Sequence, residues 1–204
     1  MEKETNAKAS LILAMVIFGT IGIFRKYIPL PSGIVACARG LLGVAFLLVF
    51  IKIKKIKMAR EAIKKHLWIL LVSGGFIGLN WVLLFESYRY TSVAVATLCY
   101  YMAPIFVMIV SPFLLKEKLT VKKVLCVIVA LIGMVFVSGV LDGGISDVSE
   151  MKGILFGLGA AALYATVIMM NQKLREVPTY DKTIMQLGAA AVVLIPYILF
   201  VEDL

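Results

Sequence analysis

Long apolar runs separated by short basic segments limit the fold of this chain more than any other feature. A helix needs about 20 mostly apolar residues to cross the hydrocarbon core of a bilayer. The chain offers seven such runs, at about residues 9–28, 33–51, 67–88, 92–115, 123–141, 153–170 and 184–201. Because the runs are long and lack the two-residue alternation of strands, they predict helices. The expected fold class is all-α, a polytopic transmembrane helix bundle.

Composition agrees with a bilayer as the surrounding medium. Of the 204 residues, 62% are hydrophobic, whereas soluble domains usually hold about 45–50%. The formal charge of +9 would suggest nucleic acid as a partner of a soluble protein. Here the basic residues lie between apolar runs, so membrane loops explain them and no nucleic-acid partner is expected.

The distribution of basic residues predicts the orientation. With a cytoplasmic N-terminus, most of the 21 Lys and Arg residues fall in inner segments, as the positive-inside rule requires. Seven spans in a cell membrane would then place the C-terminus and the acidic loop Asp142–Glu150 outside. The stretch Lys52–His66 is either a plain inner loop, which we favour, or a short interfacial helix on anionic lipid. The basic residues outside or within spans are Arg25, Lys26, Arg39, Arg89 and Lys152.

A weak internal repeat has an offset of 146–147 residues. It aligns Phe18-Gly19-Thr20 with Tyr164-Ala165-Thr166, Pro31 with Pro178, and Arg39 with Gln186. Because five spans separate the two copies, the second copy would be inverted in the membrane, as in many secondary transporters. Residues 1–141 are therefore predicted to form a first five-helix repeat. Residues 142–204 would form the start of a second repeat that ends after two helices.

Polar residues inside the spans are candidates for function, because such groups are costly at membrane depth. Arg39 lies roughly 9 Å from the outer end of its span at 1.5 Å per residue. Glu86 lies near the outer end of the third span, and Asn80 and Trp81 lie deeper in it. Asn80 and Glu86 point about 120° apart on the helix. Tyr100 and its neighbours Cys99 and Tyr101 share this outer half, which is consistent with an outward-facing cavity.

Structural alternatives exist for these residues. Glu86 and Arg89 are three apart and could form a surface pair. Arg39 could reach the outer headgroups, and Tyr88 and Tyr90 could belong to an interfacial aromatic belt.

Proline and glycine mark other positions in the spans. Pro104 lies near the middle of the fourth span and should kink it, either as a hinge or as static packing. The pairs Gly74–Gly78 and Gly153–Gly157 are interpreted as sites of close helix packing.

No enzyme is predicted, and no cofactor or metal. His66 is the only histidine, and Cys37, Cys99 and Cys126 lie inside apolar runs without a CxxC pair. These residues provide neither a metal framework nor a serine–histidine dyad. No glycine-rich phosphate loop precedes a lysine.

Three stretches of the sequence form a further pattern: Tyr90-Thr91-Ser92-Val93-Ala94-Val95-Ala96, Ala103-Pro104-Ile105-Phe106 and Leu114-Leu115-Lys116-Glu117-Lys118-Leu119-Thr120. Together they resemble the EamA family of the drug/metabolite transporter superfamily. Phe18-Gly19 is similar to the family's opening pair, and Arg39 falls where the family often has an arginine. The resemblance implies ten helices in two inverted repeats. It also implies a central cavity for metabolites such as amino acids, often for export.

Two functions follow as expectations. The first is a secondary transporter of small organic solutes, with the proton as a candidate coupling ion through Glu86. The second is an inactive or partner-dependent membrane fragment, completed by a homodimer or by missing C-terminal helices. The predicted cavity residues are Arg39, Asn80, Trp81, Glu86, Tyr100, Pro104 and Tyr164.

Overall fold

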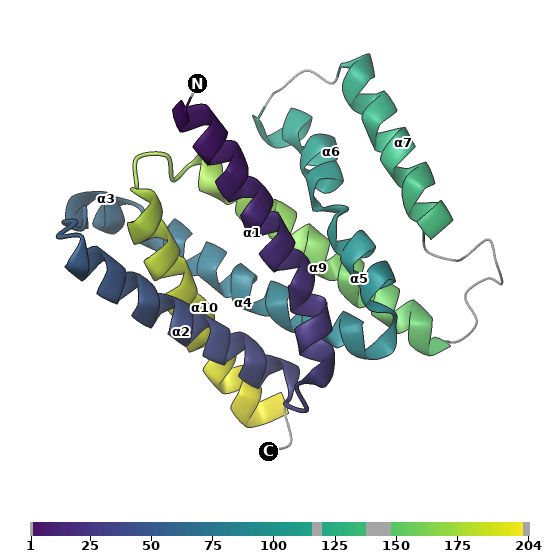
Figure 1. Ribbon diagram of the computed structural model, residues 1–204, viewed down its shortest axis with the longest axis horizontal. Helices are drawn as coiled ribbons and strands as arrows, with labels where there is room; N and C mark the ends of the chain where they lie inside the picture. Colours follow the sequence, from purple (N-terminus) through teal and green to yellow (C-terminus); the bar gives the residue numbers. More distant parts are fainter. Residues whose placement is uncertain (1, 116–119, 138–147, 202–204) are drawn as a thin grey trace.

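The computed structural model describes residues 2–115, 120–137 and 148–201, which form helices joined by short connections (Figure 1). The all-α prediction is confirmed. The helices are α1 (Glu2–Tyr27), α2 (Ser32–Ile53), α3 (Arg60–Lys65), α4 (Leu67–Tyr90), α5 (Val93–Tyr100), α6 (Ala103–Leu115), α7 (Val121–Val137), α9 (Val148–Gln172) and α10 (Thr179–Val201).

Six segments of the described chain are long and apolar enough to cross a bilayer. They are Lys8–Arg25, Ser32–Ile53, Leu67–Tyr90, Val93–Pro112, Val148–Gln172 and Thr179–Val201, and they match six of the seven predicted spans. The remaining predicted span, the fifth at 123–141, corresponds to α7, whose 17 described residues end at Val137. Residues 138–141 of that span, the Lys116–Leu119 part of the family motif and the Asp142–Asp147 part of the acidic loop lie outside the described residues.

The ends of the long helices gather at two ends of the bundle (Figure 1). We call one of them the Arg25 end: α1 finishes there, α2 begins there, and α4 and α10 finish there. We call the opposite one the α3 end, where α2 finishes and where α4 and α10 begin. Each long helix therefore runs from one end to the other, as membrane spans joined by short loops must.

Glycines let α4 and α10 approach closely in the centre of the bundle. A Cβ atom on Gly74 would lie 2.5 Å from the carbonyl oxygen of Gln186, and one on Gly78 would lie 3.0 Å from that of Ala190. Only a residue without a side chain fits such a contact. The packing interpretation of Gly74–Gly78 is confirmed.

A second glycine pair joins α9 to the helices that precede it. A Cβ on Gly157 would lie 2.8 Å from the Cβ of Cys99, and one on Gly153 would lie 2.9 Å from the amide nitrogen of Thr91. The Ser87 hydroxyl donates a hydrogen bond of 2.7 Å to the carbonyl oxygen of Gly153. This pair also acts in packing, as predicted.

The fourth predicted span is divided into two helices. The Ser92 hydroxyl caps α5 by accepting a hydrogen bond of 3.2 Å from the Val95 amide. The helix stops at Tyr100, and α6 starts at Ala103 after a turn at Tyr101 and Met102. A proline cannot donate to the carbonyl four residues before it, and its ring clashes with that carbonyl. For Pro104 that position is Tyr100, so the predicted kink takes the form of a break just before the proline.

Polar contacts tie the loops together at the α3 end. Asp181, only 1% exposed, accepts a hydrogen bond of 2.7 Å from the Ala59 amide through Oδ2. The Glu176 carboxylate lies 2.7 Å from Lys65 Nζ and 3.4 Å from His66 Nε2. Hydrogen bonds from Lys65 and His66 lower the pKa of Glu176. The loop before α10 is thus fastened to the segment between α2 and α4.

An apolar cluster lies beside these contacts. Its buried members are Leu70, Leu174 and Val177, with Ala62, Ile63, Ile69 and Met185 packed against them. Ala62 and Ile63 belong to α3, so part of Lys52–His66 is helical, and its contact with anionic lipid stays a prediction. The α3 end is therefore held together by both polar and apolar contacts.

Candidate functional site

The first part of the candidate site is an arginine that lies over a tryptophan between α2 and α4. Arg39 Cζ lies 4.5 Å from the centre of the Trp81 ring, which is a favourable cation–π distance. α2 begins at Ser32, so Arg39 lies roughly 10 Å along the helix at 1.5 Å per residue. Arg39 is half-buried, and the Trp81 ring covers one face of its guanidinium.

The second part is a buried asparagine that joins α4 to α5 and α9. Asn80 is 1% exposed, and its amide group donates a hydrogen bond to the carbonyl oxygen of Ala160. Its Oδ1 accepts a hydrogen bond of 3.4 Å from the Tyr100 hydroxyl. The Tyr100 ring in turn stacks on Tyr164 of α9, with centroids 5.4 Å apart. We call Arg39, Asn80, Trp81, Tyr88, Tyr100 and Tyr164 the central cluster.

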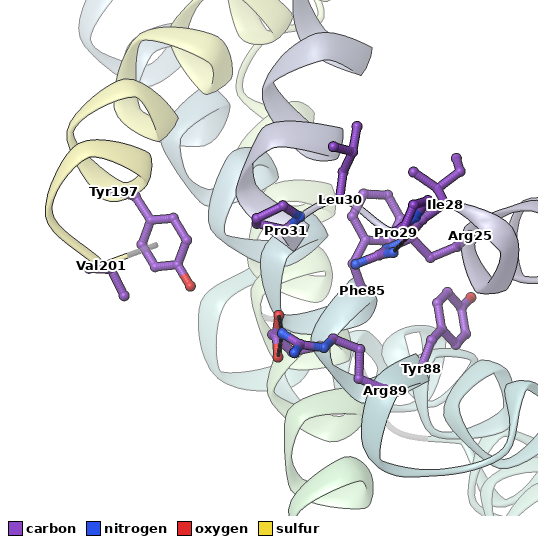
Figure 2. Close-up of a pocket in the computed structure, with 11 residues that line it drawn as sticks. Arg25, Ile28, Pro29, Leu30, Pro31, Phe85, Tyr88, Arg89, Tyr197 and Val201 are labelled. Carbon is purple, nitrogen blue, oxygen red and sulfur yellow. Dashed lines mark hydrogen bonds and ion pairs between the residues drawn. The ribbon is translucent and has the colours of Figure 1, made fainter. Parts of the chain in front are cut away.

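The third part is a pocket of about 840 Å³ at the Arg25 end (Figure 2). We call it the Arg25 pocket. Side chains from the end of α1, the α1–α2 loop and the ends of α4 and α10 surround it. Its lining consists of Arg25, Ile28, Pro29, Leu30, Pro31, Phe85, Glu86, Tyr88, Arg89, Tyr197 and Val201.

Arg25 is fixed where α1 turns into α2. Its Nη1 donates a hydrogen bond of 2.8 Å to the Ile28 carbonyl oxygen, and its Nη2 donates one of 3.0 Å to Ser32 Oγ. Its Cζ lies 5.7 Å from the centre of the Phe85 ring. Arg25 is only 7% exposed, so its position is set by packing as well as by these bonds.

Glu86 and Arg89 form an ion pair at the rim of the same pocket. Arg89 Nη1 lies 3.1 Å from Oε1 and 3.2 Å from Oε2 of Glu86. The Glu86 side chain is 16% exposed and that of Arg89 is 59% exposed. Glu86 points to the pocket while Asn80 points to α9, which confirms that the two residues face apart. The surface-pair alternative for Glu86 is the arrangement present.

The structure brings together five of the seven predicted cavity residues. Arg39, Asn80, Trp81, Tyr100 and Tyr164 share the central cluster, whereas Glu86 lies in the Arg25 pocket and Pro104 is exposed after the helix break. Tyr88 belongs to both sites, because it lines the pocket and also packs against the buried clusters that contain Trp81 and Tyr100. Its hydroxyl lies 3.4 Å from Thr97 Oγ1.

Sequence reasoning missed the roles of Arg25 and Asp181. Each lies near the end of a span, where a charge is ordinarily explained by access to water. For Arg25, the signal was a turn with Pro29, Pro31 and Ser32 directly behind it. A hydroxyl seven residues away can bond to the arginine only if the chain reverses between them.

These features define a class: a multi-pass helical membrane protein whose buried polar side chains lie between its spans. Residues 7–139 match the EamA-like transporter family. This match covers more than half of the chain, and the protein belongs to that family.

Several curated relatives share the sequence over most of its length. The "Uncharacterized transporter YxxF" of Bacillus subtilis (strain 168) is 31% identical over 201 residues, which are 98% of this chain and 64% of that protein. An "Uncharacterized transporter" of Archaeoglobus fulgidus is 25% identical over 194 residues, covering 94% of this chain and 66% of that protein. This chain therefore spans 64% of the length of the YxxF relative.

A solved crystal structure shares the fold. Its TM-score is 0.64 at 21% sequence identity, over 92% of this chain and 62% of that chain.

Proposed function

We propose that this chain is part of a secondary transporter of small organic metabolites, such as amino acids or related solutes. The observation that carries the proposal is the central cluster. It places an arginine, an asparagine and three tyrosines between spans, where polar groups are costly and usually mark a solute pathway. Family membership and the relatives named as transporters support the same function.

The asymmetry of the two ends supports transport by alternating access. The α3 end is held together by contacts of Asp181 and Glu176 and by an apolar cluster, whereas the Arg25 end holds a pocket of about 840 Å³. Tyr88 lines that pocket and packs against the buried clusters that contain Trp81 and Tyr100, so it connects the pocket to the central cluster. We interpret the structure as a state open toward the Arg25 end. The pathway would then lie between the two repeats, residues 1–141 and 142–204.

Reconstitution into vesicles tests this function. The chain would be supplied with a metabolite mixture, and the solutes that cross would be identified by mass spectrometry. Arg39→Gln should reduce the flux at least about tenfold, because it removes the charge at the centre of the pathway. Lys152→Gln, an exposed change on α9, is the matched control. Equal fluxes for Arg39→Gln and the unaltered chain would contradict the proposal.

Proton coupling through Glu86 is the finer part of the proposal. Glu86 would exchange its proton with water in the pocket, and opening of its pair with Arg89 would accompany that exchange. The Glu86→Gln variant should then transport without responding to an imposed pH gradient. An unchanged pH response would leave Glu86 as half of a surface pair, usually worth under about 1 kcal/mol.

The alternative is a fragment that needs a partner to work. Its motivation is that the chain spans 64% of the YxxF relative, and the partner would be a second copy or three further helices. Co-expression with a three-helix C-terminal segment of a relative should raise accumulation and flux together. Full activity of the 204-residue chain as a monomer would exclude this alternative.

A further inference from the structure

We infer that an apolar groove between α2, α4 and α10 binds one acyl chain of an anionic phospholipid from the leaflet at the α3 end. The phosphate of that lipid would lie among basic residues at the same end of the bundle. The inference concerns a lipid partner of the protein, so it holds or fails independently of the proposed transport of solutes.

The groove has a volume of about 500 Å³ and shares no lining residue with the Arg25 pocket. Apolar residues of three helices line it: Val44 of α2, Leu71 of α4, and Ile184, Met185, Gly188, Ala189, Val192 and Val193 of α10. It is open at the surface of the bundle, since Val192 is 65% exposed and Leu71 is 40% exposed. A hydrocarbon chain suits these walls, whereas a polar solute would lose hydrogen bonds to water there.

The depth of the groove matches one leaflet of a bilayer. Both α4 and α10 begin at the α3 end, at Leu67 and Thr179. At a rise of 1.5 Å per residue, Leu71 lies roughly 6 Å and Val193 roughly 21 Å from these helix starts. The hydrocarbon core is about 30 Å thick, so one leaflet contributes about 15 Å of it. The groove therefore extends from near the headgroups at the α3 end to the region of the bilayer midplane.

Positive charge without an acidic partner gathers at the same end. The carboxylates of α3, the α9–α10 loop and α10 are already engaged, by Lys64, Lys65 and the Ala59 amide. Among the side chains that the structure describes, no carboxylate lies within ion-pair distance of six further cations: Lys52, Lys54, Lys55, Lys57, Arg60 and Lys182. Clusters of lysine and arginine beside a membrane attract anionic lipid.

Lys182 links this charge to the groove. It is half-buried near the start of α10, three residues before Met185 and seven before Ala189, and both of these residues line the groove. These spacings place all three residues on one face of the helix. A lipid with an acyl chain in the groove would therefore have its phosphate next to Lys182.

Two contacts hold the basic segment that follows α2 beside Lys182. The Ala59 amide donates a hydrogen bond of 2.7 Å to Asp181, the neighbour of Lys182 in sequence. The Phe50 ring near the end of α2 lies 5.5 Å from the Tyr180 ring, measured between centroids. The other five cations thus belong to a segment that is fastened to the start of α10, where the groove begins.

Retention of lipid during purification tests the inference. The chain would be reconstituted in equal amounts of phosphatidylglycerol, which is anionic, and phosphatidylcholine, which has no net charge. After extraction in detergent, mass spectrometry would count the lipids bound to each chain. One phosphatidylglycerol should be retained per chain, in preference to phosphatidylcholine. Equal retention of the two lipids, or retention of neither, would overturn the inference.

Filling the groove should displace the acyl chain. A Cβ atom on Gly188 would meet no atom within 4 Å, and the same holds for Gly133 of α7, which lies outside the groove lining. Gly188→Leu should therefore keep its unfolding temperature, because leucine favours helix over glycine, and lose the retained lipid. Gly133→Leu is the matched control and should keep both. If the two variants retain phosphatidylglycerol equally, the groove does not hold the chain.

Removing one charge tests the headgroup contact. Lys182→Gln should lower the ratio of retained phosphatidylglycerol to phosphatidylcholine about fivefold, the usual effect of one lysine at an anionic surface. Lys152→Gln removes the same charge beside Gly153, whose carbonyl bonds to Ser87 near the end of α4, and should leave the ratio unchanged. An unchanged ratio in Lys182→Gln contradicts the inference even if Gly188→Leu does not fold.

A second copy of this chain is the competing occupant of the groove. It would give a dimer by native mass spectrometry that dissociates in Gly188→Leu, without a preference for phosphatidylglycerol in the unaltered chain. That result would overturn the lipid assignment, whereas a monomer that retains phosphatidylglycerol would support it.

Discussion

Two buried polar side chains of the bundle, Gln186 and Asn80, form hydrogen bonds across helices. Gln186 Nε2 donates hydrogen bonds of 2.7 Å to Ser73 Oγ and 2.8 Å to Asn171 Oδ1. Asn80 likewise bonds to groups on α5 and α9. Such bonds fix one relative placement of the helices, because an unmade bond in a low-dielectric interior is costly.

Removing the Asn80 amide should destabilise the chain measurably. Asn80→Leu leaves the Tyr100 hydroxyl without this acceptor, at a cost of about 1–3 kcal/mol. Tyr100→Phe keeps the ring on Tyr164 and removes only the hydroxyl. Because both changes remove the same Asn80–Tyr100 hydrogen bond, their effects on thermal unfolding in detergent should be less than additive. Additive effects would show that the Asn80–Tyr100 contact does not contribute.

At the residue scale, the sequence predicted which polar residues lie inside the spans but not which of their side chains contact each other. The helical spacing of Asn80 and Glu86 was enough to predict that they face apart. The pairing of Arg39 with Trp81 depends on how α2 packs against α4, and no spacing within one helix contains that information. Arg25 looked like a charge at a span end until the turn behind it was seen in three dimensions.

The helices are held together by close approaches at small residues. Within a membrane, apolar side chains gain little by leaving lipid, so packing and hydrogen bonds decide which helices associate. α4 meets α10 at Gly74 and Gly78 and meets α9 through Ser87. Sequence spacing predicted these glycine pairs as packing positions without identifying their partner helices.

Two adjacent glycines of α4 provide a matched test of this packing. A methyl group on Gly74 would lie 2.5 Å from the Gln186 carbonyl oxygen, whereas one on Gly75 would lie 3.5 Å from Val193 Cγ2, an ordinary van der Waals contact. Gly74→Ala should therefore lower the unfolding temperature. Gly75→Ala should leave it unchanged or raise it, because alanine favours helix by up to about 1 kcal/mol. Unfolding temperatures in detergent give the comparison, and equal losses would contradict the α4–α10 contact.

The positions of the helices were the most predictable feature of this structure. Six of the seven predicted runs coincide with segments long and apolar enough to span a bilayer. The length of an apolar run is sufficient to predict such a segment. The break between α5 and α6 was predicted only as a kink. A proline weakens the helical turn that precedes it. Whether the helix then bends or breaks depends on its packing against other helices.

The two ends of the whole molecule differ, because contacts between loops and helices join the α3 end while the Arg25 pocket lies at the other end. The basic segment Lys52–His66 lies at the α3 end, which the positive-inside rule would place in the cytoplasm. The Arg25 pocket would then face the outside. This orientation remains a prediction from charge, and the domain division 1–141 and 142–204 remains a prediction from the repeat.

Reporter fusions test the orientation. Fusions at His66 should give a cytoplasmic signal, and those at Asp147 and Leu204 should give signals from the opposite side. These positions follow the second, fifth and seventh predicted spans. A cytoplasmic signal at Leu204 would contradict the seven-span count.

Acid should weaken the contacts of Glu176 at the α3 end. The pKa of Glu176 is lowered from its ordinary value of 4.5 by hydrogen bonds from Lys65 and His66. A carboxyl whose folded pKa is depressed stabilises the fold above its unfolded pKa, and that contribution disappears as pH falls through the folded value. Below pH 4.5, the unaltered chain should therefore lose more thermal stability than the Glu176→Gln variant.

The difference in thermal stability between the unaltered chain and Glu176→Gln should be small, because the Lys65–Glu176 pair is exposed to water and screened by salt. Glu61→Gln is the control, since Glu61 pairs with Lys64 inside α3 and joins no second loop. If Glu176→Gln and the unaltered chain lose stability equally in acid, the contact does not fasten this end.

Tyr88 joins the two candidate sites by packing. Its ring borders the Arg25 pocket and packs against the buried clusters that contain Trp81 and Tyr100, and its hydroxyl lies 3.4 Å from Thr97 Oγ1. If the proposed function holds and solutes occupy both sites, a solute that shifts this ring from one side would change the surroundings on the other. Linkage would then require reciprocity: occupancy of the pocket would alter affinity in the central cluster by the same factor as occupancy of the central cluster alters affinity in the pocket.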